Sequence, residues 1–532
     1  MLPIACAMHR RTLLAAVGAS LASPALSQPA QVRTLRFVPQ ADVTALDPLS
    51  TTSYAVRNHG HLCWDTLYGL DAGFRPQPQL AEGCVVQRDG LEWVFTLRAG
   101  PRFHDGEPVL ARDAVASIRR WMVRDTHGQT LAGRMAGSPM AGMRVLDDRR
   151  FAIDLVRPFG AMLDALGKSS SYPCFIMPER FAGTPATVPL KEVVGSGPYR
   201  FLADEWRPGF QAVYGRFEGY VPSPVGVPSV TAGPKLAWFE RVEWRVIPDP
   251  ATAAAALQAG EVDWWERLNP DLRPLMLRTA GVVVDRVETN GTMAMLRPNH
   301  MTEPFSDPAV RRAVLGAIRQ EDFMGAINSD PARWRRMTGP FTPGSPLAAG
   351  VGDGIGDLGA GVAAVRAAGK AGARTVVLNP GDQPTNSALT LVAEDLFGKL
   401  GFGVEDATSD FGTMLARRAK KEPLDRGGWS ALIVLFGGED LNNPGGHPLL
   451  RANGGEAWFG WPTDPVLEGL RDRWFDAPDD AARREIGVGI NAQFGQSVPY
   501  WPLGQYFVDT AYRRGLVDIR RGMSLPLNVR RE

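Results

Sequence analysis

Signatures of the common catalytic and nucleotide-binding classes are missing from this 532-residue sequence. It contains no HExxH motif, no GxxxxGK[ST] loop and no GxGxxG directly after a predicted strand. In VGSGP, Ser196 resembles a hydrolase nucleophile, but Val194 breaks the G-x-S-x-G pattern and Pro198 prevents an ordinary helix from starting there. We therefore expect no catalytic residue, no metal, no cofactor and no enzymatic activity.

The sequence also lacks an excess of charge of either sign. Lysine and arginine total 58 against 57 aspartates and glutamates, and no basic block follows the N-terminus. Because phosphate binding requires a concentrated positive surface, nucleic acid is excluded as a partner. Hydrophobic residues make up 44% of the chain, which is enough to bury several cores.

Cysteine is scarce, and its spacing excludes a metal cluster. Beyond the N-terminal segment only Cys63, Cys84 and Cys174 remain, without a CxxC pair. An odd number permits at most one disulfide within the chain. A Cys63–Cys84 bond is open, but buried free thiols are favoured.

The only long apolar run follows Arg10 and Arg11, from Leu13 to about Leu26. It is too short to span a membrane comfortably and ends in small residues at signal-peptidase spacing. We predict a cleaved signal peptide over residues 1–27 and a periplasmic location, with the Sec and twin-arginine routes both open.

The stretch LEWVFTLRAGPRFHDGEPVLARDAVASIRRW predicts a strand, a turn and a helix. Asp105-Gly106 suits the turn, because glycine accepts positive φ, and a helix is expected over 111–122. These elements account for His104 and Asp105 as structural residues rather than catalysts.

Five segments, in order, carry a resemblance to a known family. They are the FHDG stretch, VVGSGPYRF, VEWRVIPDPATAAAALQAGEVD, EPFSDPAVRRAVLGAI and VPYWPLGQYFVDTAY. Together they resemble the extracellular solute-binding proteins of family 5, the peptide- and nickel-binding components of bacterial ABC importers. The matches span about residues 35–527.

The resemblance implies an α/β fold with two lobes of the periplasmic-binding-protein type and an extra subdomain inserted in the first lobe. The implied limits are 33–70, 190–267 and 496–532 for lobe I, 71–189 for the inserted subdomain and 268–495 for lobe II. EPFSDPAVRRAVLGAIRQEDFMGAI is expected to form one helix capped by Asp307, with an apolar face that includes Val310, Val314 and Ile318.

The implied function is to bind a peptide or peptide-like solute between the lobes and to deliver it, as a monomer, to permease subunits in the inner membrane. The family's amine-binding aspartate lies in a G-D-x-x-D-P-D setting, but FGGEDLNNPGGHP has Asn443 before its proline. Blocked peptides, opines, sugars, a nickel chelate and a periplasmic sensor or chaperone role therefore stay open as alternatives.

The candidate ligand-binding residues combine the segment after the first strand with acidic, amide and aromatic residues of lobe II. Aromatic side chains on glycine-rich loops offer large apolar contacts at low entropic cost. The candidates are Thr52, Ser53, Tyr54, Trp429, Phe436, Glu439, Asp440, Asn442, Asn443, Trp458 and Trp461.

Overall fold

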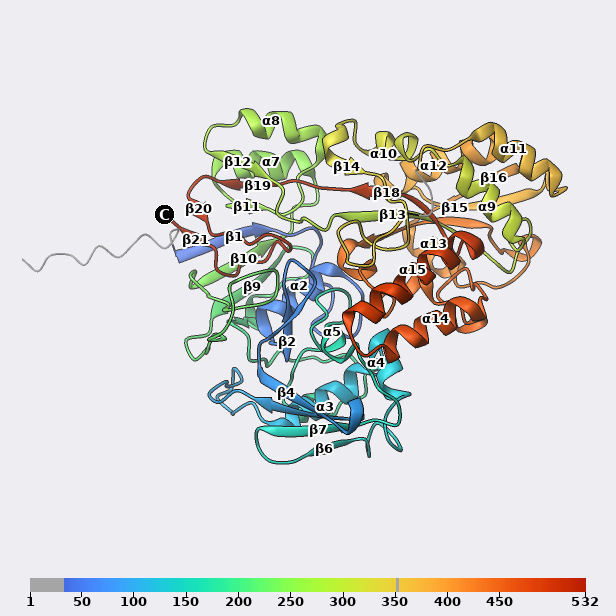
Figure 1. Cartoon of the computed structure of the whole chain (residues 1–532). Helices are drawn as coiled ribbons and strands as arrows, with labels where there is room; N and C mark the ends of the chain where they lie inside the picture. The colour runs from blue at the N-terminus through green and yellow to red at the C-terminus, as the bar shows by residue number, and fades with distance from the viewer. Residues whose placement is uncertain (1–32, 351–353) are drawn as a thin grey trace, which may run out of the picture.

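Three β-sheets organise the chain (Figure 1). The computed structural model describes residues 33–350 and 354–532, so the predicted signal peptide lies outside the described residues. Lobe I lies at the left of Figure 1, lobe II at the right, and a smaller subdomain lies below lobe I. Among the described residues no helix is long and apolar enough to cross a membrane.

Lobe I is built on a mixed seven-stranded sheet. Strand β1 (Thr34–Val38) is central and pairs in parallel with β10 and β11. Its alternating pattern places Leu35 and Phe37 in the core, where the Phe37 ring contacts Trp244 and Trp264. The other strands are β8 (Tyr199–Phe201), β9 (Gln211–Arg216), β10 (Arg241–Arg245), β11 (Trp264–Trp265), β12 (Val282–Asp285) and β19 (Thr510–Arg513), and the helices are α2 (Tyr54–Cys63), α7 (Pro250–Ala259) and α8 (Arg273–Arg278).

Lobe II is built on a six-stranded sheet in the order β14-β18-β13-β17-β15-β16. Its strands are β13 (Thr292–Pro298), β14 (Trp334–Arg335), β15 (Arg374–Pro380), β16 (Gly403–Ser409), β17 (Ala431–Gly437) and β18 (Trp501–Tyr506). Its helices are α9 (Pro308–Ala317), α10 (Gln320–Ile327), α11 (Leu358–Ala367), α12 (Pro384–Lys399), α13 (Phe411–Arg418), α14 (Pro465–Asp476) and α15 (Asp480–Ser497).

The helix expected after Asp307 is divided in two. Asp307 caps α9 by accepting from Ala309 N, as predicted. Ile318 then adopts φ −69° and ψ 120°, which ends α9 before α10 begins at Gln320. Buried Gln320 donates to Met337 O and Pro502 O, so tertiary hydrogen bonds hold the start of α10 away from the axis of α9.

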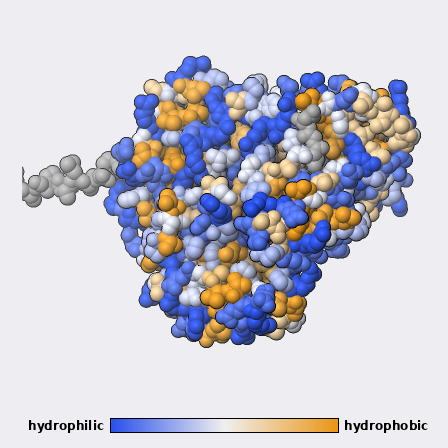
Figure 2. All heavy atoms as spheres, viewed as in Figure 1, coloured by the Kyte–Doolittle hydropathy of each residue, from blue (hydrophilic) through white to orange (hydrophobic). Residues whose placement is uncertain are grey.

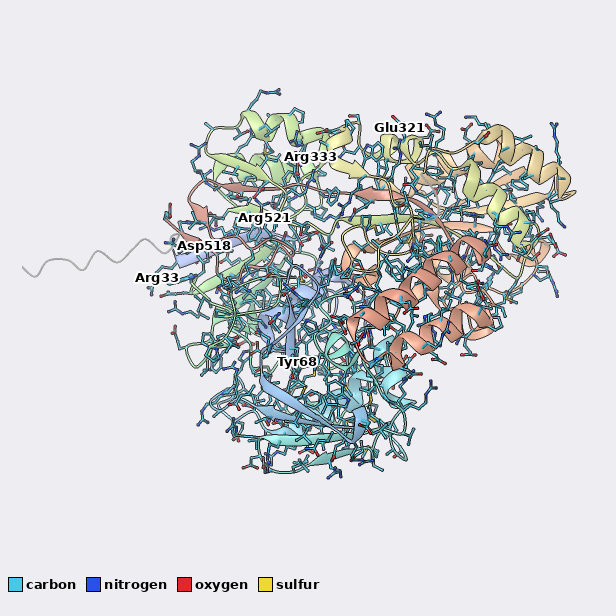
Figure 3. All side chains as sticks on the ribbon, viewed as in Figure 1. Arg33, Tyr68, Glu321, Arg333, Asp518 and Arg521 are labelled. Atoms are coloured by element: carbon cyan, nitrogen blue, oxygen red, sulfur yellow. The ribbon has the colours of Figure 1, made fainter. Side chains whose placement is uncertain are left out.

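The subdomain inserted between β1 and β8 contains a four-stranded antiparallel sheet in the order β4-β5-β7-β6. Its strands are β4 (Ala81–Gln87), β5 (Glu92–Leu97), β6 (Met143–Val145) and β7 (Arg150–Asp154); its helices are α3 (Ala111–Trp121), α4 (Thr126–Ala132), α5 (Met162–Leu166) and α6 (Glu179–Ala182). The hairpin of β2 (Tyr68–Leu70) and β3 (Pro76–Pro78) leads into it, and Tyr68 lies at this junction (Figure 3).

The chain crosses between the lobes later than the sequence indicated. Strand β12 pairs with β19 in lobe I, so the first crossing follows Asp285 rather than residue 267. Strand β18 pairs with β13 in lobe II, so the return follows Tyr506 rather than residue 495. The predicted limits were therefore wrong at both crossings, because the sequence of a strand near a crossing does not reveal which of two sheets it joins.

Asp509 on the return crossing holds both lobes. Its carboxylate accepts from Arg273 Nε of lobe I at 2.7 Å and from Arg333 Nη1 of lobe II at 2.5 Å. Arg333 lies at the top of the molecule, where the strands pass between the lobes (Figure 3). These charge-assisted contacts fix the path of the crossing.

Buried ion pairs fasten the inserted subdomain to lobe I. Arg120 of α3 binds Asp47 in a two-pronged contact of 3.1 and 2.6 Å, and both side chains are at most 1% exposed. Asp47 also accepts from Leu49 N and Leu190 N. The inserted subdomain is therefore joined to lobe I through groups that are shielded from water.

All three cysteines of the described chain are free thiols, in agreement with the favoured expectation. Cys63 and Cys174 are buried, and Cys84 is partly buried. On the face shown in Figure 2, apolar residues occur in small groups among polar ones.

Replacing Arg120 with methionine should lower the free energy of unfolding by about 3–5 kcal/mol, because Asp47 would be left buried without its cation. Urea unfolding measures this loss. Arg112→Met is the matched control, since Arg112 and Glu179 are both more than half exposed and 3.8 Å apart; that pair should contribute less than about 1 kcal/mol. Equal effects of the two variants would contradict the assignment.

Candidate functional site

Four side chains join the lobes at the first turn of α2, and we call them the interlobe contact. Tyr54 and Arg57 lie three residues apart on one face of the helix. They meet Glu439 and Asp440 of the 3₁₀ turn Gly438–Leu441, which directly follows β17. Tyr54 Oη donates to Asp440 Oδ2 at 2.5 Å and accepts from Gly437 N at 2.6 Å, while Arg57 Nη1 donates to Glu439 Oε1 at 2.5 Å.

These groups are charged or polar yet shielded from water. The side chains of Arg57 and Glu439 are 4% and 12% exposed, and the Arg57 guanidinium lies 4.4 Å from the centre of the Tyr54 ring. Burial raises the pKa of Glu439, and the positive charge of Arg57 counteracts that rise. Burial and the neighbouring carboxylates raise the pKa of the Tyr54 phenol, so it remains a hydrogen-bond donor.

A polar chain connects the interlobe contact to the centre of lobe I. Arg57 Nε donates to Asn58 Oδ1, and Asn58 Nδ2 donates to Glu266 Oε1. Glu266 follows β11 and accepts twice from Gln40, which follows β1. Burial, with the charge of Glu288, raises the pKa of Glu266 to about 8. Hydrogen bonds thus connect α2 to the carboxyl ends of the parallel strands β1 and β11.

A space of about 720 Å³, called the main cavity here, lies between the inserted subdomain and lobe II. Its apolar wall includes Phe74, Trp93 and Leu163 from one side and Leu347 and Trp474 from the other. Charged lining comes from Arg75, Asp164, Asp480, Arg483 and Arg484, and Asn442 and Asn443 complete its inner end.

Asp164 and Arg483 face each other across this cavity. Arg483 Nη1 donates to Asp164 Oδ2 at 3.1 Å, and Arg483 also donates to the carbonyl of Gly160. Burial raises the pKa of Asp164 to about 6, although the positive charge of Arg483 lowers it. The pair links α5 of the inserted subdomain to α15 of lobe II.

The structure brings together some of the predicted ligand-binding residues and separates the others. Tyr54, Glu439 and Asp440 meet in the interlobe contact, and Asn442 and Asn443 line the main cavity. Thr52 is exposed and Ser53 precedes α2 without a side-chain cap bond.

The aromatic candidates of lobe II lie elsewhere. Trp429 is fully buried in the core, where its indole N–H donates to Arg418 O, and its ring is 5.9 Å from that of Trp461. Phe436 packs against Trp458, whose ring also lies under the guanidinium of Arg418. These four aromatic rings therefore pack against other side chains of lobe II.

Sequence reasoning missed the cavity residues contributed by the inserted subdomain. Trp93 of β5 and Asp164 of the single-turn helix α5 both line the main cavity. Arg57, His127 and Lys168 were also missed. The run Lys168-Ser169-Ser170-Ser171 between apolar segments was the one visible signal, because polar residues within a buried stretch require partners.

His104 serves the scaffold, as expected. Its Nδ1 accepts from Gly195 N at 3.3 Å, and its Nε2 contacts Gly197 O at 3.0 Å. A Cβ atom at Gly195 would lie 1.9 Å from Cys63 O, so the glycine allows the VGSGP turn to approach the end of α2. The side chain of Asp105 pairs with Arg180, and Ser196 Oγ contacts Asp65 Oδ2 at 3.4 Å.

Two sheet-based lobes, paired crossings and a cavity between the inserted subdomain and lobe II are the architecture of a two-lobed binding protein. The family model for bacterial extracellular solute-binding proteins, family 5, matches residues 75–445. The chain belongs to this family. A probable peptide ABC transporter periplasmic-binding protein of Sinorhizobium fredii is 32% identical over 514 residues, covering 95% of each chain.

More distant relatives share part of the chain or the fold. The glutathione-binding protein of Escherichia coli K12 is 25% identical over 283 residues, which are 53% of this chain and 51% of that protein. The structure of AgaA from A. tumefaciens R10 with agropinic acid superposes with a TM-score of 0.76 at 20% identity, covering 94% of this chain and 99% of that one. DppA of Helicobacter pylori with the peptide STSA gives 0.75 at 19%, covering 94% and 98%.

Changing Tyr54 to phenylalanine should shift the protein toward an open form. The closed form would lose a hydrogen bond to a charged group and leave Gly437 N unpaired, a cost of about 1–3 kcal/mol. Small-angle scattering should then show a larger radius of gyration. Tyr220→Phe is the control, because its hydroxyl meets Asp65 within lobe I; expansion in both variants would disprove a specific role for Tyr54.

His104 should make stability depend on pH between about 6.5 and 4. Burial lowers its pKa from 6.5 to about 4, so protons bind the unfolded chain first as the pH falls. The associated stability is present above pH 6.5 and is lost toward pH 4, by up to about 3 kcal/mol. Urea unfolding of His104→Gln should show a correspondingly weaker pH dependence. An unchanged dependence would mean that the His104 pKa is the same in the folded and unfolded chain.

Proposed function

We propose that the protein is the periplasmic substrate-binding component of an ABC importer and that it encloses a peptide or peptide-like solute in the main cavity. The observation that supports this most directly is the cavity itself. About 720 Å³ lies within the usual range of ligand sites, and its walls combine aromatic rings with a few charged groups from both lobes.

Closure is the physical basis of the proposed function. A ligand that touches both the inserted subdomain and lobe II favours the closed arrangement by its difference in affinity for the two forms. The sequence relative of Sinorhizobium fredii, named a probable peptide transporter component, supports a peptide as the class of ligand.

The remaining parts of the proposal concern location and partners. Export through a cleaved N-terminal signal would bring the protein to the periplasm as a monomer. There the closed form would dock on permease subunits of the inner membrane. In this role the protein binds and releases its solute without chemical change, in keeping with the solute-binding family to which it belongs.

An opine or another acidic non-peptide solute is the second candidate. Glu439 and Asp440, the acids nearest the position where an amino terminus is expected, already bind Arg57 and Tyr54. A ligand without a free amine would leave those contacts intact.

Thermal unfolding against a ligand panel tests the proposed function. The panel contains di- to pentapeptides, amino-blocked peptides, opines, sugars and nickel chelates. A ligand at about 100 times its dissociation constant should add about 2.7 kcal/mol of stability. A shift with free or blocked peptides supports the peptide class, whereas a shift with opines alone supports the second candidate. No shift with any peptide would overturn the first.

A further inference from the structure

A small space at the inner end of the main cavity, which we call the serine subsite, is lined by His127, Lys168, Ser169 and Ser170. Lobe II closes it with Glu439, Asn442, Asn443 and Gly446. Its volume is about 10 Å³, close to that of one water molecule or one ligand oxygen. Asp164, Asn442 and Asn443 line both spaces, so the subsite continues the main cavity inward.

The subsite contains hydrogen-bonding groups without partners. Ser169 and Ser170 are each 1% exposed, and within the described chain neither hydroxyl oxygen has a hydrogen-bond partner. The same holds for both ring nitrogens of His127 and, in the wall of the main cavity, for Trp474 Nε1. Buried polar groups are normally paired, so this concentration of unpaired groups indicates a missing ligand atom.

The carboxylates around the two spaces, by contrast, are engaged. Glu439 binds Arg57, and Asp440 binds Tyr54 and the backbone N–H of Ser171. Asp164 binds Arg483. A ligand ammonium group would share these carboxylates with the donors that already bind them, whereas a ligand oxygen would meet the unpaired serine hydroxyls.

The charge of Lys168 completes the argument. Its ammonium group is 2.5 Å from Asp125 Oδ2, and the other Asp125 oxygen caps α4 by accepting from His127 N and Gly128 N. One carboxylate thus shares its charge among three donors. The lysine retains two further N–H groups beside the serine hydroxyls.

We propose that the serine subsite receives an oxygen of the ligand's free carboxylate, so that the solute is recognised by its carboxyl end and not by its amino end. This inference rests on the proposed function and specifies its ligand. Ser169, Ser170 and Lys168 donate to the carboxylate, and an apolar side chain of the ligand lies between Trp93 and Trp474. The exposed Arg484 adds positive charge near the same cavity.

Three forms of one tripeptide test the proposal: Ala-Phe-Ala, its N-acetyl form and its C-terminal amide. Calorimetric titration of the wild-type protein should give similar affinities for the first two and at least about tenfold weaker binding of the amide. In the double variant Ser169→Ala/Ser170→Ala, the free acid should lose about tenfold while the amide changes little.

Ser524→Ala is the matched control. Its hydroxyl is also buried and without a hydrogen-bond partner in the described residues, but it belongs to the C-terminal segment of lobe I. This variant should bind all three tripeptides as the wild type does. Without ligand, both variants should unfold at temperatures close to that of the wild type, because neither substitution removes a hydrogen bond within the protein.

A second probe separates the subsite from the peptide class. Acetate, titrated into protein with ¹⁵N-labelled histidine, should shift the His127 ring resonances in the wild type but not in the double serine variant. If no tripeptide binds but acetate gives this pattern, the peptide class fails and the subsite stands.

Three results would overturn the subsite. One is equal binding of acid and amide, a second is unchanged acid binding in the double serine variant, and the third is the absence of any acetate effect on His127. In each case the small space holds only water.

Discussion

The interlobe contact is the interaction on which the closed form depends. Arg57 and Glu439 come from different lobes, and each is buried only because the other compensates its charge. Separating the lobes would return both charges to water, where hydration replaces the pair. Closure therefore replaces the hydration of these groups with a small set of short hydrogen bonds. A modest difference in ligand affinity between the open and closed forms can then shift the equilibrium.

The inserted subdomain contacts both lobes, and the two sets of contacts differ. Asp47–Arg120 and the contacts of His104 with the VGSGP turn fasten the inserted subdomain to lobe I through buried groups. The same subdomain meets lobe II through Asp164–Arg483 and the walls of the main cavity. The main cavity therefore lies where the inserted subdomain, held to lobe I by buried groups, meets lobe II.

Much of the fold could be predicted from sequence because local signals agreed with it. Asp307 and Pro308 mark the start of α9, Gly260 with φ 78° ends α7, and the FHDG turn lies where expected. The crossings could not be placed, since the sequences of β12 and β18 do not show that the first pairs in lobe I and the second in lobe II. Trp429, one of the aromatic candidates, packs inside lobe II, because composition cannot distinguish a cleft ring from a core ring.

The candidate site shows why family membership leaves the ligand open. Asn443 stands where the family resemblance places an amine-binding aspartate, and the nearby acids Glu439 and Asp440 are already bound by partners on α2. The free hydrogen-bonding capacity lies instead in the serine subsite, where the Ser169 and Ser170 hydroxyls on the loop after α5 lack partners in the described structure. An acid already paired with a buried cation offers little to a second cation, so the unpaired donors determine which end of a solute the cavity prefers.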